Sequence, residues 1–171
     1  MRTPKFFIAL MGLAELLFAS PPARASATIA GKPITIKYGA PSVRGRQIFG
    51  DGGLVSKDWA YPVWRAGANA ATTLTTGADL DVGGLYVTAG TYSIYVLVEN
   101  PASWQLIVNR QTGKGGHIYN RRMDLDRVAM KMDRPKAPVE KLRYSITTTG
   151  ITGTIRLEWE NYVATVPIRA T

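Results

Sequence analysis

The sequence has 171 residues, of which 46% are hydrophobic, and 21 basic against 12 acidic residues give a net charge of +9 at pH 7. This length fits a single domain with one core, and the absence of cysteine excludes disulfides and cysteine-bound metals. The basic balance favours acidic glycans or anionic lipid surfaces as partners, unless it only solvates the surface.

The N-terminus has the pattern of a secretory signal peptide over residues 1–25. Two basic residues precede an apolar run at residues 6–19, and small residues in A-x-A spacing end at Ala25 and again at Ala27. We expect cleavage after Ala25, with Ala27 as the second choice and an uncleaved anchor as the alternative. Cleavage after Ala25 leaves residues 26–171 as a single domain.

An export signal places the protein in the periplasm or outside the cell. No later segment is apolar over the roughly 20 residues that a membrane span requires. We therefore expect a soluble domain with no transmembrane segment after signal cleavage, and nucleic acid is the least expected of the anionic partners.

Alternation of apolar and polar residues with a period of two dominates the rest of the chain, as in half-buried antiparallel strands. Gly- and Pro-rich turns separate the alternating segments. Residues 124–132 alternate with one break in phase, which a β-bulge would explain. The segments lie at residues 34–40, 71–76, 91–98, 103–110, 124–132, 140–149, 152–160 and 162–170. This pattern predicts an all-β, antiparallel β-sandwich of about eight or nine short strands, with a β-barrel as the alternative.

The order of motifs resembles the exported bacterial family catalogued as domain of unknown function number 2911. The resemblance implies an exported β-sandwich domain and carries over no activity. Ala66 and Ala70 stand where the family motif W-R-T-G-A-N-E-A-T has Thr and Glu, and residues 51–62 form a longer connection than usual. The motifs are YGAPSVRGRQIFG, VWRAGANAAT, TAGTYSIYVL, WQLIVNRQTG and LEWENYVATVPI, in that order.

The run from Trp64 to Asn69 is either a structural corner or part of a binding site. Trp64 is expected to bury its ring, and Gly67 permits a tight turn or a close approach of the backbone. Arg65 either braces a sheet corner or holds an anionic ligand, since its guanidinium matches carboxylates. If the loop that contains Arg46 lies at the same end of the sandwich, a polar pocket forms. The ligand-binding candidates are Tyr38, Arg46, Trp64, Arg65, Asn69 and His117.

No catalytic residue, metal site or cofactor is predicted. His117 is the one histidine, and its Gly-rich loop is typical of a solvent-exposed side chain rather than of a catalytic base. Asp79 and Asp81 flank a strand without the spacing of a calcium loop, which favours turn formation. Glu158 and Glu160 are expected to share the solvent face of one strand.

Three functions fit these observations. The first is non-enzymatic binding of an anionic ligand, a glycan or an envelope protein. The second is a hydrolase-like activity on envelope glycans or peptides, which requires titratable groups that converge in a cleft. The third is an adhesive module that pairs through an exposed strand edge. Sandwiches host many functions, so the fold alone does not decide among them.

Overall fold

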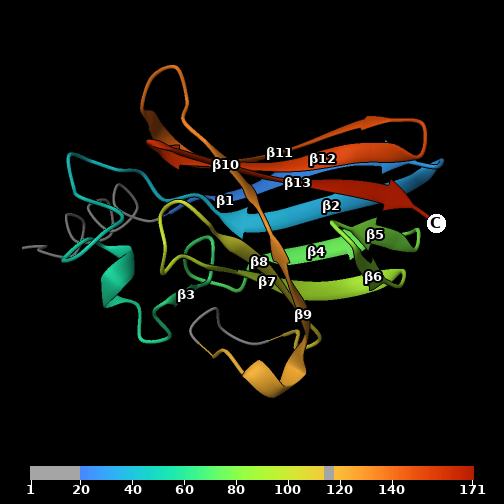
Figure 1. The fold of residues 1–171 in the computed structure, drawn as a ribbon, viewed down its shortest axis with the longest axis horizontal. Coiled ribbons are helices and arrows are strands. Elements are labelled where there is room, and N and C mark those ends of the chain that lie inside the picture. Colours follow the sequence, from blue (N-terminus) through green and yellow to red (C-terminus); the bar gives the residue numbers. More distant parts are fainter. Residues whose placement is uncertain (1–19, 114–117) are drawn as a thin grey trace, which may run out of the picture.

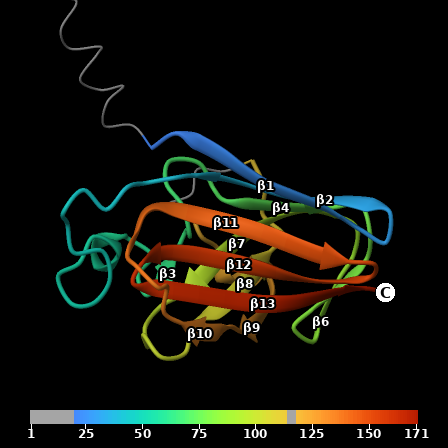
Figure 2. The same ribbon diagram turned by 90° about the horizontal axis from the view of Figure 1, so that it is seen from above.

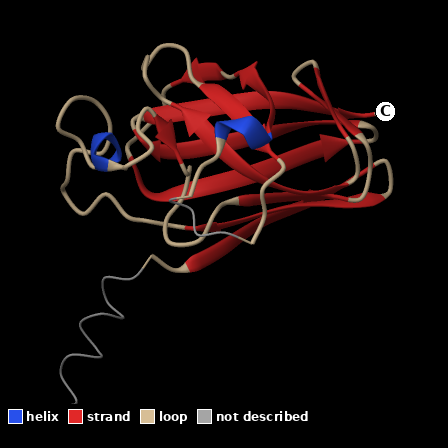
Figure 3. Ribbon diagram, turned by 90° about the horizontal axis from the view of Figure 1, so that it is seen from below, coloured by secondary structure: helices blue, strands red, loops and turns tan. Residues whose placement is uncertain are grey.

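The computed structural model describes residues 20–113 and 118–171. Within them the chain forms thirteen β-strands and two single-turn 3-10 helices, and no α-helix (Figure 1, Figure 3). The strands form two antiparallel sheets that stay separate, so the predicted β-sandwich is confirmed and the alternative barrel is not adopted.

The first sheet has seven strands, in the order β1-β2-β4-β7-β8-β9, with β3 paired to β7. Its longest strands carry the alternation on which the prediction rested. The strands are β1 (Pro22–Ile29), β2 (Lys32–Gly39), β3 (Val63–Trp64), β4 (Thr73–Thr76), β7 (Gly90–Leu97), β8 (Gln105–Asn109) and β9 (Asp124–Ala129).

The second sheet has six strands, in the order β11-β12-β13-β5-β6, with β10 paired to β13. In Figure 2 its orange and red strands lie in front of β7 and β8, so the two sheets face each other. The strands are β5 (Leu80–Val82), β6 (Leu85–Val87), β10 (Lys131–Asp133), β11 (Val139–Thr149), β12 (Thr152–Glu160) and β13 (Tyr162–Ala170); the 3-10 turns are η1 (Val55–Lys57) and η2 (Arg121–Met123).

The break in phase within residues 124–132 lies at the start of β9, where the register against β8 shifts as a β-bulge would make it: Asp126 is opposite Val108, Asp124 is opposite Asn109, and Leu125 has no opposite residue. The chain changes sheet further along. β9 pairs with β8 in the first sheet, whereas β10 pairs with β13 in the second. Met130 lies between the two strands, is buried, and donates its backbone N–H to the carbonyl of Trp104 (2.9 Å). The chain thus crosses from one layer to the other at Met130, and Val128, Met130 and Met132 stay in phase with the core across this point.

β1 includes the position where signal cleavage is expected. It pairs with β2 along its whole length, from Pro22 opposite Gly39 to Ile29 opposite Lys32. Ala25, the expected last residue of the leader, is a buried member of the core. The residues on both sides of that position therefore belong to the sandwich.

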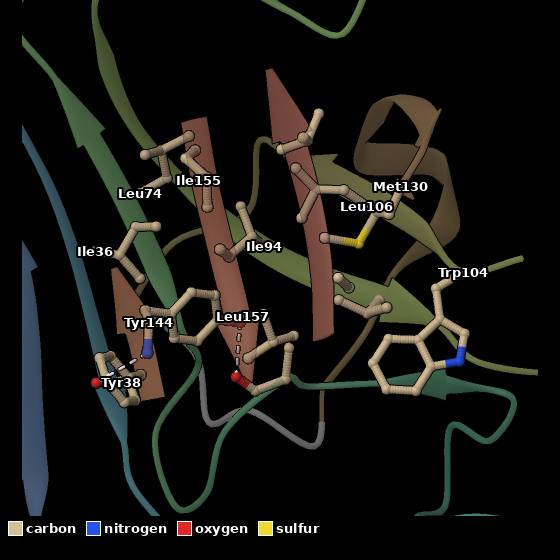
Figure 4. Close-up of a cluster of buried hydrophobic side chains, with 14 of the residues drawn as sticks. Ile36, Tyr38, Leu74, Ile94, Trp104, Leu106, Met130, Tyr144, Ile155 and Leu157 are labelled. Carbon is tan, nitrogen blue, oxygen red and sulfur yellow. Dashed lines mark hydrogen bonds between the residues drawn. The ribbon is translucent and has the colours of Figure 1, made fainter. Parts of the chain in front are cut away.

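The core fills the space between the sheets with the inward-facing residues of both (Figure 4). Ile36 from β2 and Ile155 from β12 are among its fully buried side chains, as the alternation predicts. Tyr38 meets Tyr144 across the layers with ring centroids 4.8 Å apart. The backbone N–H of Tyr144 also donates to the Tyr38 hydroxyl (3.1 Å), which fixes the end of β2 against β11.

Candidate functional site

A cleft of about 380 Å³ opens at the end of the sandwich opposite the C-terminus. β2 ends there, β3 begins there, and the long loop of residues 40–62 projects beside it (Figure 1, teal). The side chains that carry charge or polarity into the cleft are Arg44, Arg46, Lys57, Asp58, Arg65 and Asn69. Four of these are basic and one is acidic, so the cleft is an electropositive site.

The corner after β3 has an unusual backbone that explains its small residues. Ala66 (φ 50°) and Asn69 (φ 63°) occupy the left-handed region, which non-glycine residues adopt rarely. A Cβ on Gly67 would lie 2.5 Å from the Thr72 hydroxyl oxygen. Tight local packing therefore requires glycine at position 67.

The carbonyl of Ala66 is the anchor of this corner. It accepts hydrogen bonds from the Thr72 hydroxyl (3.1 Å) and from the Tyr144 hydroxyl (2.9 Å), both in the buried interior. Burial raises the pKa of Tyr144, so this hydroxyl stays a donor over the physiological range. Tyr38 supports Tyr144 from behind and does not line the cleft. Tyr38 therefore supports the corner beside the cleft and is not part of the cleft wall.

Trp64 forms part of the cleft wall and is 3% exposed. Its ring stacks on Trp159, with centroids 5.8 Å apart and an interplanar angle of 16°. Phe49 meets Trp64 edge to face at 5.4 Å and contacts Trp104 as well. This aromatic packing is rigid, because each ring is held by several others.

Arg65 is held by an ion pair but keeps unused donors. Its Nε donates to Asp58 Oδ2 at 3.1 Å, and its side chain is 23% exposed. Asp58 Oδ1 accepts from the backbone N–H of Ala60 (3.3 Å), so both carboxylate oxygens are engaged. Within residues 20–113 and 118–171, the two terminal nitrogens of Arg65 have no hydrogen-bond partner. Asp58 therefore orients a guanidinium whose outer edge is free for a ligand.

Arg46 has a different role. Its Nε donates to the carbonyl of Val43 (3.0 Å), and one terminal nitrogen donates to the carbonyl of Ser42 (2.6 Å). The backbone N–H of Arg44 donates to Glu140 Oε1 (2.8 Å), which ties this loop to β11. Arg46 is therefore a brace that also adds positive charge to the cleft.

Asn69 lies at the rim and separates the cleft from a second cavity. Its Nδ2 donates to the backbone carbonyl of Ser20 (3.1 Å). The second cavity, of about 500 Å³, is lined by Tyr38, Ala70 and residues of β1, among others. Ser20, Ala68 and Asn69 line both spaces.

Four of the six predicted ligand-binding residues thus line one cleft, namely Arg46, Trp64, Arg65 and Asn69. Tyr38 borders the second cavity, and His117 lies outside the described residues. Sequence reasoning did not select Asp58, which the fold brings back onto Arg65. The signal in the sequence that could have indicated Asp58 is its position seven residues before Arg65, within the long connection of residues 51–62.

The region next to His117 holds a polar network. Tyr119 donates its hydroxyl to Asp124 Oδ2 (2.6 Å) and accepts from Arg127 (3.1 Å). Burial, together with the bond to Asp124, raises the pKa of Tyr119 to about 12. Asn109 donates to the other oxygen of Asp124 (2.8 Å). Each group has a partner, which is typical of a structural brace.

The remaining carboxylates serve turns and an ion-pair cluster. Asp79 accepts from the Ala89 backbone N–H (2.7 Å) and the Tyr86 hydroxyl (2.8 Å), and these bonds lower its pKa. Glu158 does not lie in solvent as expected: it is 7% exposed and paired with two arginines. Glu160 adopts a positive φ at the following turn. In the part of the chain that the structure describes, no three His, Asp or Glu residues gather as metal ligands would.

None of the helices in the described residues has the length and apolar character that crossing a bilayer requires. No curated protein and no solved structure matches the chain. The sequence model of the family described as Protein of unknown function (DUF2911) matches residues 20–168, which is most of the chain. The match begins at Ser20, the residue that Asn69 binds. The chain therefore belongs to the DUF2911 family, as the order of its motifs indicates.

Proposed function

We propose that this protein is an exported, non-enzymatic binding domain that holds an anionic sugar in the cleft beside Arg65. The export signal in the sequence supports a periplasmic or secreted location, where acidic glycans are available ligands. The carboxylate of a hexuronate, such as galacturonate, has the charge and the planar geometry that a guanidinium recognises.

The observation that carries this proposal is the state of Arg65. A guanidinium bound through Nε alone keeps its terminal nitrogens available, and these nitrogens belong to a side chain that lines the cleft. Because Asp58 already holds the arginine in place, a ligand need not pay the full entropic cost of ordering it. Preorganised donors in an electropositive cleft are suited to binding an anion.

The cleft is less suited to hydrolysis. Among the residues that line it, Asp58 is the one carboxylate, and both of its oxygens are engaged by Arg65 and by the Ala60 backbone. Glycoside hydrolysis requires two carboxyl groups across the scissile bond, one of them free to donate a proton. The geometry therefore favours capture of a ligand over its cleavage.

The test is calorimetric titration of the purified protein with galacturonate, with neutral galactose as the comparison. We expect galacturonate to bind and galactose not to bind. Arg65→Ala should weaken the affinity at least tenfold, which corresponds to about 1.4 kcal/mol, because a charge-assisted hydrogen bond is lost.

Arg156→Ala is the matched control. Arg156 is also an arginine paired with a carboxylate, but it lies outside the residues that line the cleft. Equal losses of affinity in Arg65→Ala and Arg156→Ala, equal binding of galactose, or no binding of galacturonate would each contradict the proposal.

A further inference from the structure

The cleft and the second cavity are neighbouring hollows on either side of Asn69, and we name the two together the groove. They share Ser20, Ala68 and Asn69 as a common wall. Asn69 lies at the rim between the two spaces, where its side chain donates to the carbonyl of Ser20. It is exposed and adopts the left-handed conformation. A ligand that crosses the rim at Asn69 would reach both spaces.

The second cavity carries its own positive charge. Arg24 on β1 and Lys37 on β2 line it, and both are exposed. The two residues lie directly opposite each other in the antiparallel pair. Like charges at opposed positions destabilise a sheet, and within the described residues neither side chain has an acidic partner. An anion placed between them would remove this repulsion.

The charges of the groove are almost all of one sign. Six basic side chains line the two cavities together, against the one carboxylate of Asp58, which is already paired. The basic residues are divided between the two sides of Asn69: Arg24 and Lys37 on one side, Arg44, Arg46, Lys57 and Arg65 on the other. A single small anion neutralises one side alone, whereas a chain of repeated anionic units neutralises both.

We infer that the groove of the chain that retains Ser20 and Arg24, either uncleaved or cleaved before Ser20, binds a linear acidic oligosaccharide, a polyuronate, with one uronate in the cleft at Arg65 and a later one between Arg24 and Lys37. This inference rests on the proposed function, because it places the first unit in the cleft. Linking a second contact to the first raises affinity through effective concentration, without any change in the first contact. The chain length of the ligand should therefore govern its affinity.

The experiment is a titration of the purified protein with galacturonate and with its linear oligomers of two, four and six units. We expect the hexamer to bind at least tenfold more tightly than the monomer. Lys37→Ala should abolish this gain while leaving the affinity for the monomer unchanged. Arg65→Ala should weaken the binding of both.

Lys32→Ala is the control, because Lys32 is an exposed lysine at the other end of β2 and lines neither cavity. The melting temperature should not fall in Lys37→Ala, since the substitution removes a like-charge contact. A hexamer that binds no more tightly than the monomer overturns the inference and leaves the proposed function intact. Oligomer binding that depends on Lys37 but not on Arg65 contradicts the proposed function instead. Tighter binding of a single-stranded oligonucleotide of equal charge would show that the ligand class is wrong.

Discussion

Two of the ion-pair sites in the described residues, Asp58 with Arg65 and Glu158 with Arg143 and Arg156, differ in where their arginines lie. At the cleft, Asp58 engages the Nε of Arg65 and no other arginine nitrogen. On the outer face of the second sheet, Glu158 receives two bonds from Arg143 (3.0 and 2.7 Å) and one from Arg156 (2.8 Å). Both members of the first pair line the cleft, whereas Glu158 and Arg156 lie outside it and Arg143 borders a different hollow.

The difference shows that a buried ion pair is not by itself the mark of a functional site. Burial alone would raise the pKa of Glu158, but the hydrogen bonds and charges of Arg156 and Arg143 outweigh it and lower that pKa. Both oxygens of the Glu158 carboxylate accept hydrogen bonds from arginines of the same sheet. The cluster therefore stabilises the sheet, and its carboxylate needs no ligand as a partner. Arg156 also donates through one nitrogen alone, so what distinguishes Arg65 is that its unused donors belong to a side chain that lines the cleft.

The largest expected effect comes from removing the aromatic support of the cleft. Trp64→Ala should lower the free energy of unfolding by about 3–5 kcal/mol, because a buried ring stacked on Trp159 leaves a cavity. Urea denaturation measures this change. Trp59→Ala is the matched control, since Trp59 is 60% exposed and should lose well under 1 kcal/mol. Similar losses in the two variants would show that Trp64 does not support the corner.

Removing the carboxylate of the second pair should affect stability and not binding. Glu158→Gln leaves Arg143 and Arg156 as neighbouring like charges, and we expect a loss of about 1–2 kcal/mol at pH 7. The affinity for galacturonate should stay at the wild-type value. Glu160→Gln, two residues further on at the turn, serves as the control for stability. A weaker affinity in Glu158→Gln would link the outer face to the cleft and remove the contrast between the two pairs.

The corresponding change at the cleft should affect binding even though it adds positive charge. Asp58→Asn removes the one carboxylate of the cleft, so simple attraction predicts a tighter complex with galacturonate. We expect the opposite, a loss of about tenfold or 1.4 kcal/mol, because Arg65 loses the partner that orients it. Calorimetric titration distinguishes the two results. A gain of affinity would mean that Asp58 acts only through its charge.

The smallest expected effect is the dependence of stability on acid. The pKa of Glu158 is lowered in the folded state from a reference value of 4.5. Its contribution to stability is therefore complete above that value and is lost as the pH falls through the lower folded pKa. Thermal melts from pH 7 to pH 2.5 should show a smaller decline for Glu158→Gln than for the wild type. Asp79, whose pKa is also lowered, should leave a residual decline in the variant.

Much of the fold follows from local alternation, and the rest depends on contacts between distant segments. β2 and β12 are visible in the sequence because one face of each is apolar and buried, and β7 because it is a run of β-branched and aromatic residues buried on both faces. β1 is harder to recognise, since its inward residues are mostly alanines, which also suit a cleavage region. The slip in phase at Leu125 indicates the register shift of β9, whereas the change of sheet at Met130 leaves the alternation in phase and is visible only from the pairing partners.

The candidate site, like the fold, could be predicted from the sequence only where local residue types indicate it. The run from Trp64 to Asn69 is recognisable because its residue types suit both a tight corner and an anion, and it forms the corner as well as the cleft wall. The roles of Asp58 and Arg46 depend on which carbonyls and cations the loop of residues 40–62 meets after folding. Tyr38 has an inward position that alternation predicts, but its partner Tyr144 comes from a strand 106 residues later.

The position of β1 links the two proposals of export and of ligand binding. If the leader is cut after Ala25, the cut removes half of the β1 pairs with β2, from Pro22 to Ala25. The same cut takes away Ser20, which lines both cavities, and Arg24, which charges one of them. A cut before Ser20 keeps both. If the protein is exported as we propose, the position of signal cleavage therefore decides whether the domain keeps this wall of the groove or ends in an open sheet edge beside Lys37.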